Sequence, residues 1–188
     1  KSPVSNGYSR ADREAGGNGY VPISLQLKDY TATEARAQSM AAGDPVIDPT
    51  ITNRSYLNKT SKSNSYPDLN TILDTKKAMN GKPVLVAITV SNPMVFGEFE
   101  KEVDAIVGEF GVQMEALLDI VSGKTEPSGL LPLQMPIDMT TVEKQFEDVP
   151  HDMIPYRDAN GNVYDFGFGL NWKGTIKDAR TEKYSVKK

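Results

Sequence analysis

A continuous apolar run at residues 83–90, PVLVAITV, is the strongest pattern in the chain. It is rich in β-branched residues, and Gly81 and the Asn92-Pro93 pair bound it. Such a run is typical of a strand that is covered on both faces, which is the usual condition of a parallel sheet. A second short apolar run, DAIV at 104–107, predicts a second buried strand.

Apolar residues at helical spacing follow each of these two predicted strands. After the first, Pro93 can open a helix that turns four apolar side chains toward the core: Val95, Phe96, Phe99 and Val103. After the second, QMEALLDIV at 113–121 predicts a helix that Gly123 closes. The apolar face of this helix consists of Met114, Leu117, Leu118 and Val121. The succession of strand, helix, strand and helix predicts an α/β fold with parallel strands and right-handed crossovers.

The first 80 residues contain more polar and loop-forming positions. Residues 1–20 predict a loop, and a short extended run follows at 21–27. TEARAQSMAA at 33–42 predicts a helix with a capping Thr at its start and a Gly after its end. Residues 43–67 are rich in Asp, Pro, Asn, Ser and Thr and predict a long loop. Residues 68–79 carry apolar side chains at helical spacing and predict a second helix, with the face Leu69, Ile72 and Leu73.

The C-terminal part has a different texture. After Pro127 the chain is too rich in Pro for central strands. DANGN at 158–162 predicts a tight turn. A calcium loop needs Gly at its sixth position and Glu at its twelfth, whereas here Gly161 is at the fourth position and Gly169 at the twelfth. Residues 163–170 alternate Gly with aromatic residues and predict a hairpin-like or extended end, which a charged tail follows from Lys173.

Composition excludes several classes of partner and of functional site. The 188 residues carry a net charge of −4, which argues against nucleic acid as a partner because phosphate binding needs a basic face. No apolar run reaches the roughly 18 residues of a membrane span. The chain has no Cys and one His, so we expect no disulfide, no metal centre built on Cys or His, and no Cys nucleophile. The polar opening at Lys1 predicts a piece of a longer protein.

Three segments together resemble the C-terminal domain of glycoside hydrolase family 3. They are GKPVLVAITVSNPMVF, then DAIVGEFGVQMEALLDIVSGKTEPSGLLPLQMP, and finally YDFGFGLNW. The resemblance runs from about residue 80 to 172, and GNGYVPISLQ near the start is similar to the longer bacterial members. It implies a three-layer α/β sandwich with a mostly parallel sheet, here partial and followed by a Pro/Gly-rich extension. Members are β-glucosidases and related exo-acting β-glycosidases.

The resemblance also implies a division of labour between two domains. A preceding barrel domain supplies an Asp nucleophile, and in many members a loop of the second domain supplies the acid/base Glu of a retaining mechanism. The implied partners are a carbohydrate substrate and this N-terminal barrel, and no cofactor is implied. The implied location is the periplasm or the outside of the cell.

Two placements of the acid/base position stay open. In one, SNGYSR at 5–10 matches a Gly-Glu-Gly-Tyr-Asp-Arg-like stretch, so that Asn6 stands at the position of the acid/base Glu. An amide cannot donate a proton at neutral pH, and Asn6 would then not fill this role. In the other, Glu14 serves from the Gly-rich loop DREAGGN. Arg13 and Asn18 of that loop are candidate substrate-binding residues.

The aromatic residues near the C-terminus give one further candidate. Tyr164, Phe166 and Phe168 share one side of an extended chain, a pattern that predicts core packing. Trp172 breaks the series and is the better candidate for a sugar-binding surface.

These observations divide the chain into three parts: a loop-rich, active-site-facing segment at 1–80, the sandwich core and closing segment at 81–172, and a charged tail at 173–188. We expect part of a glycosidase that supplies a substrate loop and the candidate acid/base Glu14, and that is inactive by itself. The alternative is a non-catalytic structural or carbohydrate-binding module.

Overall fold

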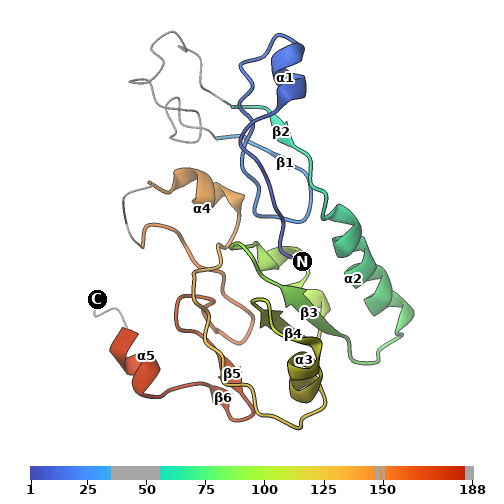
Figure 1. Cartoon of the computed structure of the whole chain (residues 1–188), viewed down its shortest axis with the longest axis vertical. Helices are drawn as coiled ribbons and strands as arrows, with labels where there is room; N and C mark the ends of the chain where they lie inside the picture. Colours follow the sequence, from blue (N-terminus) through green and yellow to red (C-terminus); the bar gives the residue numbers. More distant parts are fainter. Residues whose placement is uncertain (35–55, 147–148, 150, 185–188) are drawn as a thin grey trace.

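The computed structural model describes residues 1–34, 56–146, 149 and 151–184. The helix expected at 33–42 lies outside the described residues except for its first two positions, as does the first half of the loop expected at 43–67. Figure 1 shows the arrangement, with α1 (Arg10–Glu14) and the small pair β1 (Tyr30–Thr31) and β2 (Thr60–Ser61) at one end. The strands β5 (Leu170–Asn171) and β6 (Gly174–Thr175) lie near the other end.

The centre of the fold is a parallel pair of strands, as the two apolar runs predict. β3 (Leu85–Thr89) pairs with β4 (Ala105–Glu109) in register, with Leu85 opposite Ala105. The prediction that this strand is covered on both faces is wrong, because Ile88 is buried while Leu85, Ala87 and Thr89 are exposed. Successive side chains of a strand point to opposite faces. The described core therefore lies against one face only.

The connection between these strands is not the expected α-helix. It consists of two 3₁₀ turns, η2 (Phe96–Glu98) and η3 (Glu100–Glu102). Phe99, at the junction, has a φ of −149°, outside the helical range, and its ring packs in the core at 5.7 Å from that of Phe96. The predicted burial of Val95, Phe96 and Phe99 is confirmed, although the helix is not.

The helix α3 (Met114–Val121) forms where the sequence predicts it, but its apolar face does not enter the core. None of its residues is buried, and Met114, Leu118 and Val121 are exposed. The prediction of a core face is therefore wrong for this chain. Helical periodicity identifies the apolar face but not the structure that covers it.

The helix α2 (Tyr66–Ala78) confirms the pattern at 68–79 and starts two residues earlier, with Pro67 in its first turn. Its buried residue is Leu69. The chain leaves α2 through Asn80 and Gly81, both with positive φ, which is typical of a helix C-terminus.

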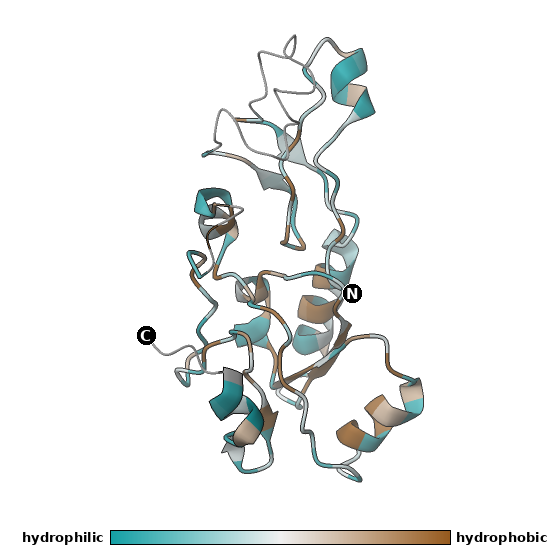
Figure 2. Cartoon of the chain, turned by 60° about the vertical axis from the view of Figure 1, so that its left-hand side comes forward, coloured by the Kyte–Doolittle hydropathy of each residue, from teal (hydrophilic) through white to brown (hydrophobic). Residues whose placement is uncertain are grey.

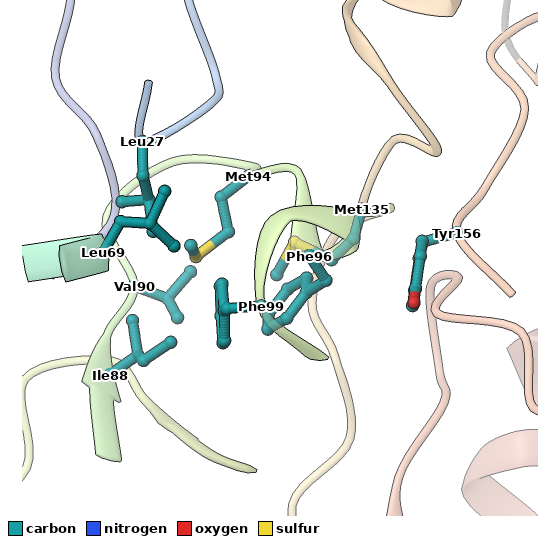
Figure 3. Packing of buried hydrophobic residues seen from close by; sticks show 9 residues of the cluster. All are labelled: Leu27, Leu69, Ile88, Val90, Met94, Phe96, Phe99, Met135 and Tyr156. Atoms are coloured by element: carbon teal, nitrogen blue, oxygen red, sulfur yellow. The ribbon is translucent and has the colours of Figure 1, made fainter. Parts of the chain in front are cut away.

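The core joins this helix to the strands, the 3₁₀ turns and the C-terminal part (Figure 3). Its buried members are Leu27, Leu69, Ile88, Val90, Met94, Phe96, Phe99, Met135 and Tyr156. Tyr164 packs against this cluster and stacks on Phe168 with the ring centroids 5.1 Å apart. The predicted core role is confirmed for Tyr164, whereas Phe166 is exposed.

Short elements complete the C-terminal part: α4 (Met139–Lys144), the pair β5 and β6, and α5 (Ala179–Tyr184). The turn expected at 158–162 is confirmed by the hydrogen bond from the Gly161 N–H to the Asp158 carbonyl. The antiparallel bridge between Arg157 and Val163 matches the expected hairpin-like end.

Candidate functional site

The Gly-rich loop at residues 7–21 folds back on itself as a narrow ladder. Ser9 N–H donates to the carbonyl of Gly19 at 2.8 Å, and Val21 N–H donates to that of Gly7 at 3.1 Å. The helix α1 forms the tip of this loop, where the sequence predicts no element. The Ser9 hydroxyl caps α1 by accepting from the Asp12 N–H, and Figure 2 shows the helix as mostly hydrophilic.

Two glycines of the loop are required by close packing. A Cβ on Gly17 would lie 2.2 Å from Oδ2 of Asp12, far inside van der Waals contact. A Cβ on Gly19 would lie 2.6 Å from the Tyr8 ring, and the φ of Gly19 is +86°. The glycines therefore allow the two sides of the loop to approach each other, which gives the Gly-rich sequence a structural reason.

The carboxylate of Asp12 is the centre of the loop. Its Oδ2 accepts from the Gly19 N–H at 2.8 Å and from Nζ of Lys59 at 2.6 Å. Lys59 also donates to Oδ1 of Asn18 in a short hydrogen bond. The side chains of Lys59 and Asp12 are only 23% and 24% exposed. The hydrogen bond from Lys59, followed by that from Gly19, holds the pKa of Asp12 below its usual value.

Glu14 ends α1 and stands at the exposed tip. Its Oε1 accepts from Nε of Arg10 at 2.7 Å, with the two side chains 62% and 87% exposed. Exposed i,i+4 pairs of this kind contribute little to stability. The Glu14 side chain is therefore largely exposed to solvent at the end of α1.

The other sequence-predicted site residues divide into two groups. Arg13 donates from Nη1 to the Gly17 carbonyl at 3.4 Å, and Asn18 also accepts from the Tyr20 N–H at 3.0 Å. Both thus share the loop of Glu14, and Asn6 lies at its base, where it accepts from the Tyr8 N–H. Trp172 does not join them, because it lies between β5 and β6 at the other end of Figure 1 and is 61% exposed.

Sequence reasoning missed Asp12 and Lys59. They are 47 positions apart, and nothing in either local pattern indicates that they meet. The one local signal is the Ser-x-x-Asp spacing of Ser9 and Asp12, which puts a capping hydroxyl before the helix and an acidic residue in its first turn.

The lowered pKa of Asp12 predicts an acid-sensitive loop. Because the folded pKa lies below the unfolded one, the ionised carboxylate stabilises the loop above the usual value of 3.8. This contribution is lost as the pH falls through the folded pKa. A carbon-detected NMR titration of the Asp12 carboxyl should give a midpoint below 3.8, and the Gly19 amide shift should change with it. A midpoint at or above 3.8 contradicts the described contact.

Known proteins match the chain in the following way. A model of the family described as "Glycosyl hydrolase family 3 C-terminal domain" matches residues 21–172, beginning at the last residue of the loop. "Probable beta-glucosidase C" of Aspergillus flavus is 36% identical over 104 residues, which are 53% of this chain and 16% of that protein. "Beta-glucosidase C" of Emericella nidulans is 34% identical over 104 residues, with the same two shares.

A bacterial relative is more distant. "Periplasmic beta-glucosidase/beta-xylosidase" of Dickeya chrysanthemi is 27% identical over 107 residues, 57% of this chain and 15% of that protein. The matched region thus spans about a sixth of each curated relative. No solved structure gives a significant match.

Two absences in the described part of the structure bear on the site. No helix in the described ranges is both long and apolar enough to cross a membrane. Within the part of the chain that the structure describes, no group of three or more His, Asp or Glu side chains is placed to hold a metal ion.

The family match covers most of the sequence and includes the parallel pair β3 and β4. The chain therefore belongs to glycosyl hydrolase family 3, through the C-terminal domain of that family.

Proposed function

We propose that this chain is part of a retaining, exo-acting β-glycosidase that hydrolyses β-glucosides or β-glucan oligosaccharides. The family match and the names of the relatives support a glycosidase. The observation that carries the proposal is the loop at 7–21, which presents Glu14 at an exposed tip while Lys59 holds Asp12 of the same helix.

In this proposal Glu14 is the acid/base carboxyl. It protonates the departing glycosidic oxygen and then removes a proton from the water that releases the glycosyl-enzyme intermediate. The nucleophile is an Asp of a barrel domain outside this sequence, and the two carboxyl groups must come within about 5–5.5 Å. Arg13 and Asn18 flank the same position and are the proposed contacts to substrate hydroxyl groups.

The three-layer sandwich and the division at 80 and 172 are also proposals. Ser2 N–H donates to the Thr89 carbonyl at 2.8 Å, on the opposite edge of β3 from β4. In the proposed sandwich, further strands pair along this edge, and a covering layer packs on the sheet face that carries the exposed Leu85. The exposed apolar face of α3 is likewise suited to packing against a further layer.

We place the parent protein in the periplasm or outside the cell, as the resemblance to the family implies.

The exposed Arg10–Glu14 pair supports a second candidate, a non-catalytic module. Such pairs occur on any solvated helix, and the exposed ring of Trp172 offers a flat apolar face for a sugar ring. In that case the chemistry lies wholly in another domain, and replacing Glu14 leaves turnover unchanged.

The isolated chain is expected to be inactive, because the proposed mechanism needs a nucleophile from another domain. Purified chain should release no 4-nitrophenol from aryl β-glucosides, whereas the parent protein with its barrel domain should. Turnover by the chain alone contradicts the two-domain site. A parent protein without activity on any aryl β-glycoside contradicts the function itself.

A further inference from the structure

Lys59 connects two parts of the molecule that are distant in sequence. It lies beside β2, and its ammonium group reaches Asp12 and Asn18 on opposite sides of the Gly-rich loop. Because Asp12 also accepts from the Gly19 N–H, one cation and one carboxylate hold both sides of the loop. The contact is charge-assisted and three-quarters removed from solvent, whereas the pairs Arg10–Glu14 and Lys62–Asp29 are exposed.

The backbone that carries Lys59 is itself held firmly. Lys59 N–H donates to the Tyr56 carbonyl at 3.0 Å, and its own carbonyl accepts from the buried Ala32 N–H at 3.1 Å. Asn58, with a φ of +63°, makes the turn between them. The Tyr56 hydroxyl donates to the buried Glu143 of α4 at 2.7 Å. The ammonium group thus extends from a turn that is tied to the rest of the fold.

We propose that Lys59 is a positioning residue that fixes the loop at 7–21 through Asp12 and Asn18, and thereby sets the place of α1 and Glu14. Asp12 and Glu14 both belong to α1, so a shift at Asp12 moves Glu14 with it. The part of this inference that concerns catalysis rests on the proposed function. The part that concerns the loop does not.

The chain offers a matched control in the same strand region. Lys62 pairs with Asp29 at 2.8 Å, three residues after Lys59, but its side chain is 81% exposed. Removing either Lys removes one positive charge and one ion pair. Only the removal of Lys59 deprives the loop of its contact, so the two variants separate anchoring from charge.

The first test measures hydrogen exchange in the chain itself. In Lys59→Cys, we expect the amides of Ser9, Gly19 and Val21 to exchange about tenfold faster or more, because opening of the loop exposes them. Lys62→Cys should leave them unchanged. The amides of Val90 and Asp104, which bond across β3 and β4, report whether the core stays folded.

Chemical rescue separates a positioning cation from a merely structural side chain. The chain has no Cys of its own, so a single introduced thiol can be alkylated selectively. Alkylation of Lys59→Cys with 2-bromoethylamine restores an ammonium group at nearly the length of Lys and should return the exchange rates to within about threefold of the original. Alkylation with iodoacetamide, which adds a neutral group, should not. Unchanged exchange in Lys59→Cys, or equal rescue by both reagents, overturns the proposal.

The second test measures turnover by the parent enzyme. Lys59→Met should lower kcat for β-glucosides with poor leaving groups by about 10- to 100-fold, because misplacement by about 1 Å has effects of this size. Lys62→Met should leave kcat unchanged. If exchange rises in Lys59→Cys while kcat is unaffected by Lys59→Met, the anchor stands and the proposed role of Glu14 falls. If exchange does not rise, the anchor falls whatever the kinetics show.

Discussion

Glu14→Gln in the parent enzyme is expected to slow hydrolysis of β-glucosides with poor leaving groups by about 10²- to 10⁴-fold, the usual contribution of a general acid. An alkoxide leaves slowly unless it is protonated as the bond breaks, and an amide cannot supply that proton. An activated aryl group leaves without a proton, so the first step with such substrates should stay fast. The glycosyl-enzyme should then accumulate, because its hydrolysis needs Glu14 as base.

The measurement is a comparison of kcat/KM across a series of leaving groups, together with the size of the initial burst. Glu102→Gln is a matched control, because Glu102 is an exposed carboxylate of η3 in the same chain. It should leave both quantities unchanged. Equal small effects of the two substitutions would make Glu14 a bystander and favour the non-catalytic module.

The elements that could be predicted are those with a strong local pattern. The β-branched run at β3 and the helical spacing at α2 and α3 each need only a few neighbouring residues. The segment after Pro93 carries the same kind of spacing, yet it forms η2 and η3, because Phe99 leaves the helical path as it packs. Local propensity is overridden there by the core.

The candidate site shows the same limit. Arg13, Glu14 and Asn18 are close in sequence, so their presence in one loop could be predicted. The contact between Lys59 and Asp12 could not, because it depends on β1, β2 and the turn at Asn58 bringing the chain back. Trp172 is separated from the loop for the complementary reason, since the strands β5 and β6 hold it at the far end.

Leu69→Ala and Leu118→Ala are expected to differ greatly in their effect on the free energy of unfolding. Both residues are Leu in helices, so helix propensity changes equally. Leu69 of α2 is 0% exposed, and its truncation should lower the free energy of unfolding of the chain by about 2–5 kcal/mol. Leu118 of α3 is 57% exposed, and its truncation should change that free energy by no more than about 0.5 kcal/mol.

Urea unfolding of the chain, followed by circular dichroism, measures both values. Equal losses would contradict the exposed position of the α3 face. The same pair of substitutions then tests the proposed sandwich. If the longer parent protein covers α3, Leu118→Ala should cost about 2–5 kcal/mol there, as expected for a buried Leu, while the cost of Leu69→Ala should stay the same. A cost of Leu118→Ala that remains near zero in the parent would show that this face stays in solvent, and the sandwich would then lack its expected layer.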